Sequence, residues 1–193
     1  MMPRDACLKI LARHRTDQLV VSVYRAAFEW KVIAPSPLNY VAVGAMGQAS
    51  SHGLGLAIGR PDRQVWVLDG DGSLLMNLGT LVTIAAQAPR NLVHFVGENG
   101  VYEVNGSHPI PGHGRMDLAA MARAAGYRHS FTFDQIATFA AGIGEILTLE
   151  GPVFVRLRIV PGEDYPMDWP YVHGPEQRDA FRAALRAQPP IST

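Results

Sequence analysis

Short apolar runs alternate with helical patterns along most of the chain. The apolar runs are almost uninterrupted, which is typical of strands that are buried on both faces of a sheet. They predict strands at Leu19–Val23, Tyr40–Val43, Val65–Leu68, Leu92–Val96, His129–Phe133 and Val153–Ile159. Because strands and helices alternate, we expect an α/β fold with three layers: a doubly wound, mostly parallel six-stranded sheet with helices on both faces.

The segments between these strands have the spacing of amphipathic helices. Ser73, Asp117 and Asp134 are expected to cap the starts of three of them, and Gly126 is expected to close the helix that Asp117 begins. The expected helices are Asp5–Arg15, Gln48–Ile58, Leu74–Gln87, Leu118–Ala125, a helix from Asp134 to about Leu149, and Glu176–Ala187.

The composition fits one globular domain, which we expect over residues 1–193 with a C-terminal extension at 161–193. The 193 residues are 48% apolar and 18% charged, and 17 basic residues balance 17 acidic ones, so no basic surface for nucleic acid is indicated. Cys7 is the single cysteine, which excludes an internal disulfide and a multi-thiolate metal site. The chain shows neither a signal peptide nor a run long enough to span a membrane, so we expect a cytoplasmic protein.

The segment VWVLDGDGS at 65–73 combines the features of a turn that binds phosphate and metal. A buried strand ends there and a helix begins directly, and Gly70 and Gly72 allow a sharp turn and close approach of a ligand. Asp71 offers a hard oxygen ligand to a cation such as Mg²⁺. Asn99 follows the next strand, so we expect the two loops to be neighbours at the carboxyl edge of the sheet.

Other interpretations of these residues are weaker. Asp71 alone could be a simple turn residue, and the residues after it lack the ligands of a calcium-binding loop. The glycines of GLGLAIG at 53–59 have the wrong spacing for a dinucleotide-binding fingerprint, and are expected to allow close packing of helix on sheet. His52 is expected to be a structural or surface residue.

The GDG turn followed by Asn99 resembles the thiamine diphosphate motif of the enzyme superfamily that uses this cofactor. The segments AVGAMGQASSHGLGLAIG, GDGSLLMNLGTLVTIAAQAPRNL and NGVY are similar to the beta subunit of sulfopyruvate decarboxylase and to the corresponding half of phosphonopyruvate decarboxylase. This resemblance covers about Arg4 to Val160. The superfamily usually has two consecutive Asn residues at the second site, and here Glu98 replaces the first.

The resemblance implies a thiamine diphosphate-binding fold and a metal site. Mg²⁺ would be held by Asp71, by the side chain of Asn99 and by the backbone carbonyl of Val101. Gly72 and Ser73 would donate to the diphosphate of the cofactor. The remaining residues implied to contact the cofactor are Gly44, Ala45, Met46, Gly70 and Tyr102.

Within the segment at 44–47, the resemblance implies contacts to the aminopyrimidine ring of the cofactor. The carbonyl of Gly44 would accept a hydrogen bond from the amino group of the ring. Met46 would contact the ring through its backbone N–H and wedge its side chain between the two rings of the cofactor, a role that suits an adaptable apolar residue.

The implied function is that of a carbon–carbon lyase, a decarboxylase of small 2-oxo acids such as sulfopyruvate or phosphonopyruvate. In the superfamily, a Glu that activates the cofactor comes from a separate pyrimidine-binding domain, and no Glu of this chain has the required context. We therefore expect an alpha-type partner subunit that supplies this Glu, in a hetero-oligomer such as α2β2. The long loop at about 98–115 offers His108 and His113 as candidate substrate contacts.

Three alternatives stay open. A carboligase would share the early steps of the reaction. A subunit of a ferredoxin-coupled 2-oxo acid oxidoreductase usually carries a cysteine set for an iron–sulfur cluster, which one cysteine cannot provide. The third alternative is a non-catalytic module that binds a nucleotide or another cofactor. No residue of the chain identifies a sulfonate or phosphonate substrate uniquely.

Overall fold

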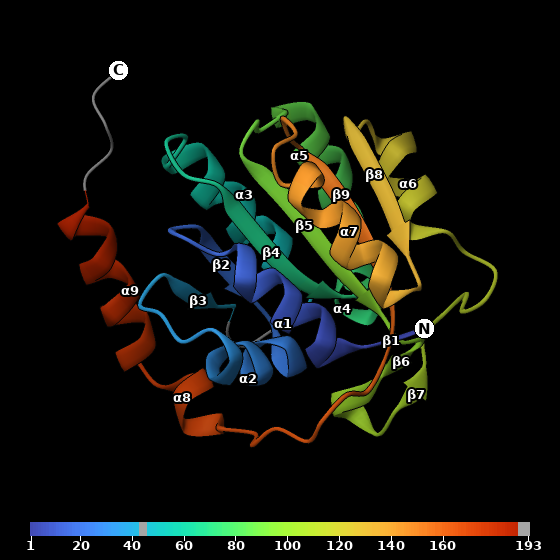
Figure 1. The fold of residues 1–193 in the computed structure, drawn as a ribbon, viewed down its shortest axis with the longest axis horizontal. Helices are drawn as coiled ribbons and strands as arrows, with labels where there is room; N and C mark the ends of the chain where they lie inside the picture. The colour runs from blue at the N-terminus through green and yellow to red at the C-terminus, as the bar shows by residue number, and fades with distance from the viewer. Residues whose placement is uncertain (43–45, 189–193) are drawn as a thin grey trace.

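A parallel sheet forms the centre of the computed structural model, which describes residues 1–42 and 46–188 (Figure 1). The strand order is β3–β2–β4–β5–β9, and β9 also pairs with β8 and with the two-residue β1. The strands are β1 (Met2–Pro3), β2 (Leu19–Ser22), β3 (Asn39–Val41), β4 (Val65–Gly70), β5 (Leu92–Glu98), β8 (His129–Phe133) and β9 (Val153–Val160). All of these pairings are parallel, so the six expected strands are present and β1 is an addition.

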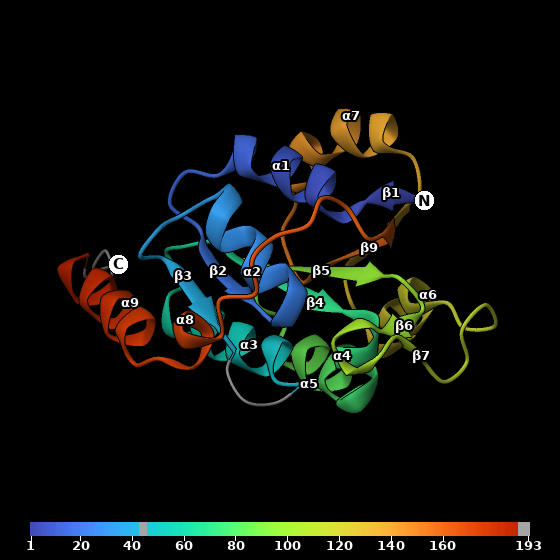
Figure 2. The ribbon, with the colours of Figure 1, turned by 90° about the horizontal axis from the view of Figure 1, so that it is seen from below.

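Helices cover both faces of the sheet, as Figure 2 shows. On one face lie α1 (Arg4–His14), α2 (Tyr24–Ile33) and α7 (Ile136–Ile146). On the other lie α3 (Ala49–Gly59), α4 (Asp71–Met76), α5 (Thr80–Gln87) and α6 (Leu118–Ala125). The predicted three-layer α/β fold is therefore confirmed. None of the helices in the described residues is long and apolar enough to cross a membrane.

The helix expected at 74–87 is in fact two helices, α4 and α5. The chain leaves the helical conformation at Asn77, whose side-chain Nδ2 donates to the carbonyl of Gly47 at 3.0 Å. Ser73 is not the N-cap, because α4 already begins at Asp71 and the Ser73 hydroxyl accepts from the N–H of Gly47 at 2.9 Å. Hydrogen bonds to a distant loop therefore override the local helical pattern at this point.

The other predicted helix ends are partly correct. Asp117 caps α6 by accepting from the N–H groups of Ala119 and Ala120, and Gly126 closes that helix in the left-handed conformation. Asp134 does not cap α7, which begins at Ile136 without a side-chain cap. The long loop contains a small antiparallel hairpin, β6 (Val101–Tyr102) and β7 (His108–Pro109).

Helix α2 was not expected from the sequence. Four consecutive residues, Ala27, Phe28, Glu29 and Trp30, are buried, so the helix has no single apolar stripe that a periodicity could reveal. It packs against α1, β2 and β4. Its first residues follow directly on β2, which brings them to the carboxyl edge of the sheet.

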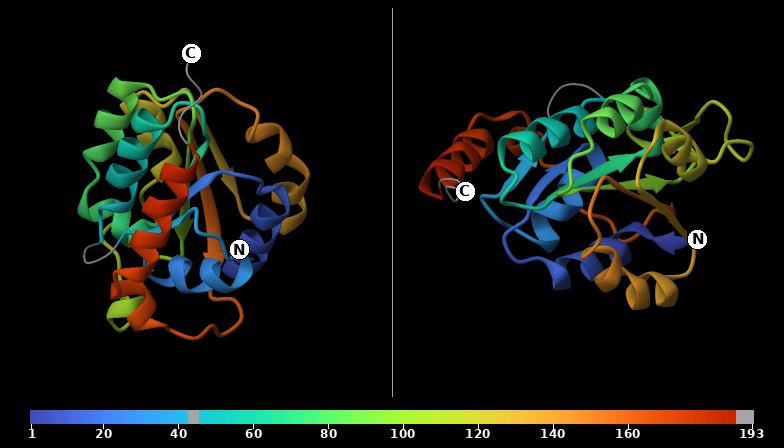
Figure 3. Two further views of the ribbon diagram at one scale, coloured as in Figure 1. Left: turned by 90° about the vertical axis from the view of Figure 1, so that its left-hand side faces the viewer. Right: turned by 90° about the horizontal axis from the view of Figure 1, so that it is seen from above.

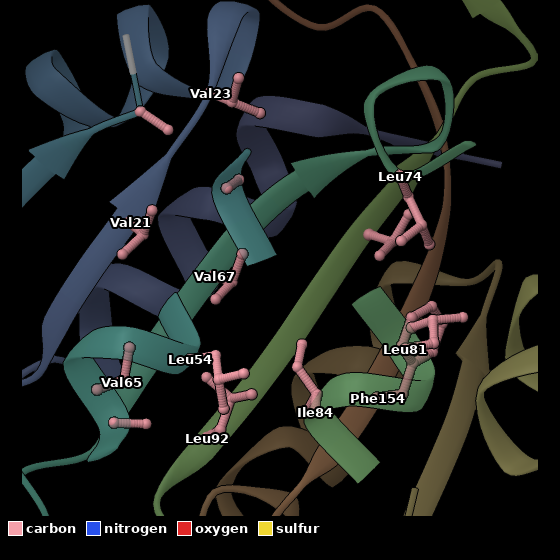
Figure 4. Packing of buried hydrophobic residues seen from close by; sticks show 14 of the residues in the cluster. Val21, Val23, Leu54, Val65, Val67, Leu74, Leu81, Ile84, Leu92 and Phe154 are labelled. Carbon is pink, nitrogen blue, oxygen red and sulfur yellow. The ribbon is translucent and has the colours of Figure 1, made fainter. Parts of the chain in front are cut away.

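The core consists of two apolar layers, one on each face of the sheet. Figure 4 shows the layer beneath α3 and α5, where Leu54, Leu81 and Ile84 lie over the strands. A Cβ at Gly53 would lie 2.2 Å from a methyl carbon of Val67, so this glycine does allow the close packing of helix on sheet that was expected. Trp30, Trp66, Phe95, Phe139 and Ile143 belong to the opposite layer.

The C-terminal segment covers the β3 edge of the sheet (Figures 1 and 3). It contains α8 (Trp169–His173) and α9 (Glu176–Ala187). Phe181 of α9 packs against Tyr40 of β3, with 5.3 Å between ring centroids. The side-chain oxygen of Gln177 accepts from the backbone N–H of Val41 at 3.4 Å. Because β3 would otherwise present a free edge, α9 protects it from pairing with other strands.

Candidate functional site

A cleft lies at the carboxyl ends of β2, β4 and β5. The first residues of α2, the GDG turn and the start of the loop after β5 meet there. The predicted site residues that line the cleft are Met46, Gly70, Asp71, Gly72, Ser73, Asn99, Val101 and Tyr102. Gly44 and Ala45, the other two predicted cofactor contacts, lie outside the described residues.

Asp71 is a buried carboxylate in this cleft, with 2% of its surface exposed. One oxygen, Oδ1, accepts from the N–H of Gly72 at 2.8 Å, and Oδ2 accepts from the N–H of Gly100 at 2.7 Å. Burial raises the pKa of this carboxyl, although the two backbone donors oppose the effect. No basic side chain forms an ion pair with Asp71 within the described ranges. A buried carboxylate without a cationic partner is suited to receive a cation from outside the chain.

Asn99 lies on the loop that reaches Asp71 through Gly100. Its amide oxygen Oδ1 accepts from the N–H of Val101 at 3.0 Å, and its Nδ2 donates to Oε2 of Glu103 at 3.0 Å. β4 and β5 are neighbours in the sheet and place Gly70 opposite Gly97. The acid and the amide, which are far apart in the sequence, therefore come from adjoining loops, as the spacing of the motif predicted.

Tyr102 and the glycines define the walls beside Asp71. A Cβ at Gly72 would lie 2.6 Å from the ring of Tyr102, whereas a Cβ at Gly70 would meet nothing within 4 Å. Tyr102 therefore packs over Gly72, and the backbone of Gly70 remains accessible to a ligand. Met46 lines the cleft a few residues before α3, and its neighbour Gly47 is hydrogen-bonded to Ser73 of α4 and to Asn77.

Among the cleft residues that sequence reasoning missed are four with long polar side chains, Arg4, Tyr24, Arg25 and Glu103. Three of them lie on α1 or α2, and the second of these helices gave no periodic signal. Tyr24 has a φ of 47°, an unusual value for a residue with a side chain, and such backbone strain is often found at functional sites. Glu103 lies four residues after Asn99 of the predicted motif. Only its contacts in the folded chain show that it belongs to the site.

Arg4 and Glu103 form a charged network at the cleft. Arg4 donates to both oxygens of Glu29 and, through Nη1 at 2.6 Å and Nη2 at 3.2 Å, to Glu103. The Nε of Arg25 lies 3.2 Å from Oε1 of Glu103. Burial alone would raise the pKa of Glu103, but its bonds to Arg4 and the charge of Arg25 hold this pKa below its ordinary value.

Asp69 is the remaining cleft-lining acid of the described residues. Its Oδ1 accepts from the N–H of Gly70 at 2.9 Å, and its Oδ2 lies 3.3 Å from Nε2 of His94. The other ring nitrogen of His94 lies 3.2 Å from the hydroxyl of Tyr127. These contacts fix the start of the GDG turn, so Asp69 is engaged in holding the backbone.

The two loop histidines do not line the cleft. Both His108 and His113 are exposed, and the ring of His113 packs against Gly100, where an added Cβ would lie 2.3 Å away. Their role as substrate contacts stays a prediction. Glu98 replaces the first Asn of the motif. It accepts a hydrogen bond from Arg156 of β9, with 2.7 Å from Nη2 to Oε1, so it links the end of β5 to the neighbouring strand.

The donor set of the cleft suits a hard cation. No cluster of three or more His, Cys, Asp or Glu side chains that could hold a metal is present in residues 1–42 and 46–188. A site of one carboxylate, one amide oxygen and one backbone carbonyl leaves positions for phosphate oxygens and water, which is how Mg²⁺ is usually bound beside a phosphorylated ligand. The residues present therefore fit Mg²⁺ together with a diphosphate.

Comparison with known proteins shows which proteins the chain resembles. The chain is 41% identical over 171 residues to "Sulfopyruvate decarboxylase subunit beta" of Methanothermobacter thermautotrophicus, covering 86% of this chain and 88% of that protein. It is 37% identical over 182 residues to "Phosphonopyruvate decarboxylase" of Streptomyces viridochromogenes. This match covers 94% of the chain but 45% of the relative, so the chain spans about half of that protein's length.

The fold has counterparts among solved structures. Benzoylformate decarboxylase from Polynucleobacter necessarius superposes with a TM-score of 0.68 at 21% identity, covering 85% of this chain and 34% of that one. The family model "Thiamine pyrophosphate enzyme, C-terminal TPP binding domain" matches residues 21–157, which contain every predicted site residue. The chain therefore belongs to the family of C-terminal domains that bind thiamine pyrophosphate, thiamine diphosphate by its other name.

Proposed function

We propose that the chain is the diphosphate- and metal-binding subunit of a thiamine diphosphate- and Mg²⁺-dependent decarboxylase of small 2-oxo acids. The observation that carries this proposal is the buried carboxylate of Asp71, which has backbone donors but no cationic side chain among the described residues and faces the loop of Asn99. The names of the relatives, sulfopyruvate and phosphonopyruvate decarboxylase, suggest the class of substrate.

The residues of this chain would hold and orient the cofactor. Asp71, the amide oxygen of Asn99 and the carbonyl of Val101 would bind Mg²⁺, which would in turn bind the diphosphate. Ser73 has a hydroxyl hydrogen left for a phosphate oxygen, because it accepts from Gly47. Met46, which lines the cleft, would pack against the cofactor rings. When bound, thiamine diphosphate would supply an electron sink that accepts the electron pair of the broken carbon–carbon bond as carbon dioxide leaves.

A partner subunit would complete the site. The acids that line the cleft in the described residues are Asp69, Asp71 and Glu103. Asp69 is engaged by His94 and Glu103 by Arg4, and Asp71 is assigned to the metal. None is therefore available to activate the pyrimidine ring, and we infer that an alpha-type partner supplies this Glu. The name "Sulfopyruvate decarboxylase subunit beta", which similar proteins carry, supports the inference.

Calorimetry with the full chain tests the binding part of the proposal. We expect thiamine diphosphate to bind only when Mg²⁺ is present and the Asp71→Ala variant to bind neither, because the variant lacks the one carboxylate ligand. Asp134→Ala, which removes an acid of the same type that does not line the cleft, serves as the control. Tight binding of NAD without any response to thiamine diphosphate would contradict the proposal.

Reconstitution tests the catalytic part. The chain would be co-expressed with a candidate pyrimidine-domain subunit and supplied with a panel of 2-oxo acids, and the aldehyde product would be measured. We expect activity from the pair and none from either subunit alone. Full activity of this chain in isolation would contradict the partner role, and a condensation product in place of the aldehyde would indicate a carboligase.

A further inference from the structure

The amide of Asn99 has one orientation only in this structure. Glu103 is a carboxylate and can only accept a hydrogen bond, so the group that faces it at 3.0 Å must be Nδ2. The backbone N–H of Val101 can only donate, so the group that faces it at 3.0 Å must be Oδ1. The two neighbours independently require the same orientation, which leaves the oxygen on the side away from Glu103.

Glu103 is itself held in place by the N-terminal helix. Arg4 of α1 contacts both oxygens of Glu103, at 2.6 and 3.2 Å. Arg4 is fixed in turn by three hydrogen bonds to the buried carboxylate of Glu29 on α2. The side chains of Arg4, Glu29 and Glu103 are 11%, 3% and 15% exposed, so solvent screens this chain of contacts only weakly.

We propose that Glu103 is a positioning residue for the metal site, which turns the amide oxygen of Asn99 toward the cation and is anchored for this task by Arg4. The inference rests on the proposed function, because it assumes that Asn99 binds Mg²⁺. Loss of a group that orients a metal ligand through a hydrogen bond typically weakens metal binding by about 10- to 100-fold. In this chain the orienting group and its anchor come from different elements, the loop after β5 and helix α1.

The Glu103→Gln variant tests the role with almost no change of shape. An uncharged Gln is a weaker acceptor for Nδ2 and can also offer its own amide hydrogens, so only the N–H of Val101 still fixes the orientation of the amide of residue 99. We expect the dissociation constant of Mg²⁺, measured by calorimetry with the full chain and saturating thiamine diphosphate, to rise about 10-fold or more. Glu150→Gln, which breaks an exposed ion pair to Arg128, should leave it unchanged.

The same substitution made in an Asn99→Asp protein separates an effect of amide orientation from an effect of negative charge. In the Asn99→Asp variant, residue 99 offers only acceptors and faces the acceptor Glu103. Adding Glu103→Gln then restores a donor and an acceptor in exchanged positions. We therefore expect Glu103→Gln to strengthen Mg²⁺ binding in the Asn99→Asp background, although it weakens binding in the wild-type background. A role through negative charge alone would weaken binding in both backgrounds and would overturn the proposal.

The anchor is tested with Arg4→Lys, which keeps the charge but loses the forked geometry of the guanidinium. We expect weaker Mg²⁺ binding in the wild-type background and no further weakening when Glu103→Gln is already present. Thermal unfolding without metal, measured in parallel, shows that each variant is folded. Equal Mg²⁺ constants for wild type and Glu103→Gln, with only a lower unfolding temperature, would overturn the positioning role. A wild-type chain without Mg²⁺-dependent cofactor binding would overturn the proposed function itself.

Discussion

At the residue scale, the cleft depends on buried polar groups that are held by backbone N–H groups and by one another. Asp71 is buried and is held by two backbone N–H groups, while Asn99 and Glu103 form a bonded pair beside it. The motif predicted Asp71 and Asn99 because both lie at strand ends. It could not predict Arg4 or Glu103, since their pairing depends on two segments that are 99 residues apart.

His52 provides a prediction about pH at this scale. It packs edge-on against Tyr40, its Nδ1 is buried without a hydrogen-bond partner among the described residues, and burial lowers the pKa of its ring below 6.5. The unfolded chain therefore binds more protons at His52 than the native chain, and the free energy of unfolding should fall as the pH drops below about 6.5. We expect His52→Phe to lose less stability than wild type between about pH 7 and pH 5.

Urea unfolding of both proteins at the two pH values would measure this difference. All other titrating groups are common to the two proteins, so their contributions cancel in the comparison. Equal losses of stability would show that His52 does not titrate differently in the folded and unfolded states.

At the scale of elements, long-range contacts explain where the sequence pattern was misleading. The pattern at 74–87 is that of one helix, but Asn77 bonds to Gly47 and divides it into α4 and α5. Helix α2 gave no pattern because neighbours bury it on several sides. The strands were found almost completely, because burial on both faces leaves an uninterrupted apolar run that needs no knowledge of the neighbours.

Helix α3 offers a matched pair of glycine substitutions. A Cβ at Gly53 would lie 2.2 Å from Val67, whereas a Cβ at Gly55 would meet nothing within 4 Å. We expect Gly53→Ala to lower the free energy of unfolding by about 1–3 kcal/mol through overpacking. Gly55→Ala should raise it by about 0.5–1 kcal/mol, because alanine favours the helix. Urea unfolding would measure both, and equal effects would contradict the close packing of α3.

Helix α9 offers a second pair of substitutions, one at a buried and one at an exposed position. Phe181 is 3% exposed and lies against Tyr40, so Phe181→Ala should cost about 3–5 kcal/mol. Arg182 is exposed on the same helix, and Arg182→Ala should change stability by less than about 0.5 kcal/mol. The comparison uses the same unfolding measurement. A small effect of Phe181→Ala would mean that α9 contributes little to covering β3.

At the scale of the whole molecule, the site lies where three segments of the chain meet at one edge of the parallel sheet. The family and the fold follow from strand order and motif together. Under the proposed function the activating Glu belongs to a partner subunit, so no pattern of residues in this chain predicts it. The substrate class is likewise proposed from the relatives' names and has no counterpart in a single residue here.

Cofactor binding should stabilise the whole fold. A ligand that binds only the native state contributes about 2.7 kcal/mol at about 100 times its dissociation constant. For a chain of this size each kcal/mol raises the unfolding temperature by about 2–4 °C, so we expect a rise of about 5–10 °C with thiamine diphosphate and Mg²⁺ together. Neither thiamine diphosphate with a chelator nor the Asp71→Ala variant should show it, and a rise in either case would point to binding elsewhere.

The pairing of β1 with the end of β9 has a practical consequence for all of these measurements. Met2 is buried and pairs with Ile159, and Arg4 begins the helix that follows. A purification tag fused in front of Met1 would therefore begin within a few residues of the guanidinium that anchors Glu103. A tag attached behind α9, at the opposite border of the sheet, keeps its bulk away from that anchor, and expression vectors for reconstitution are best designed in this way.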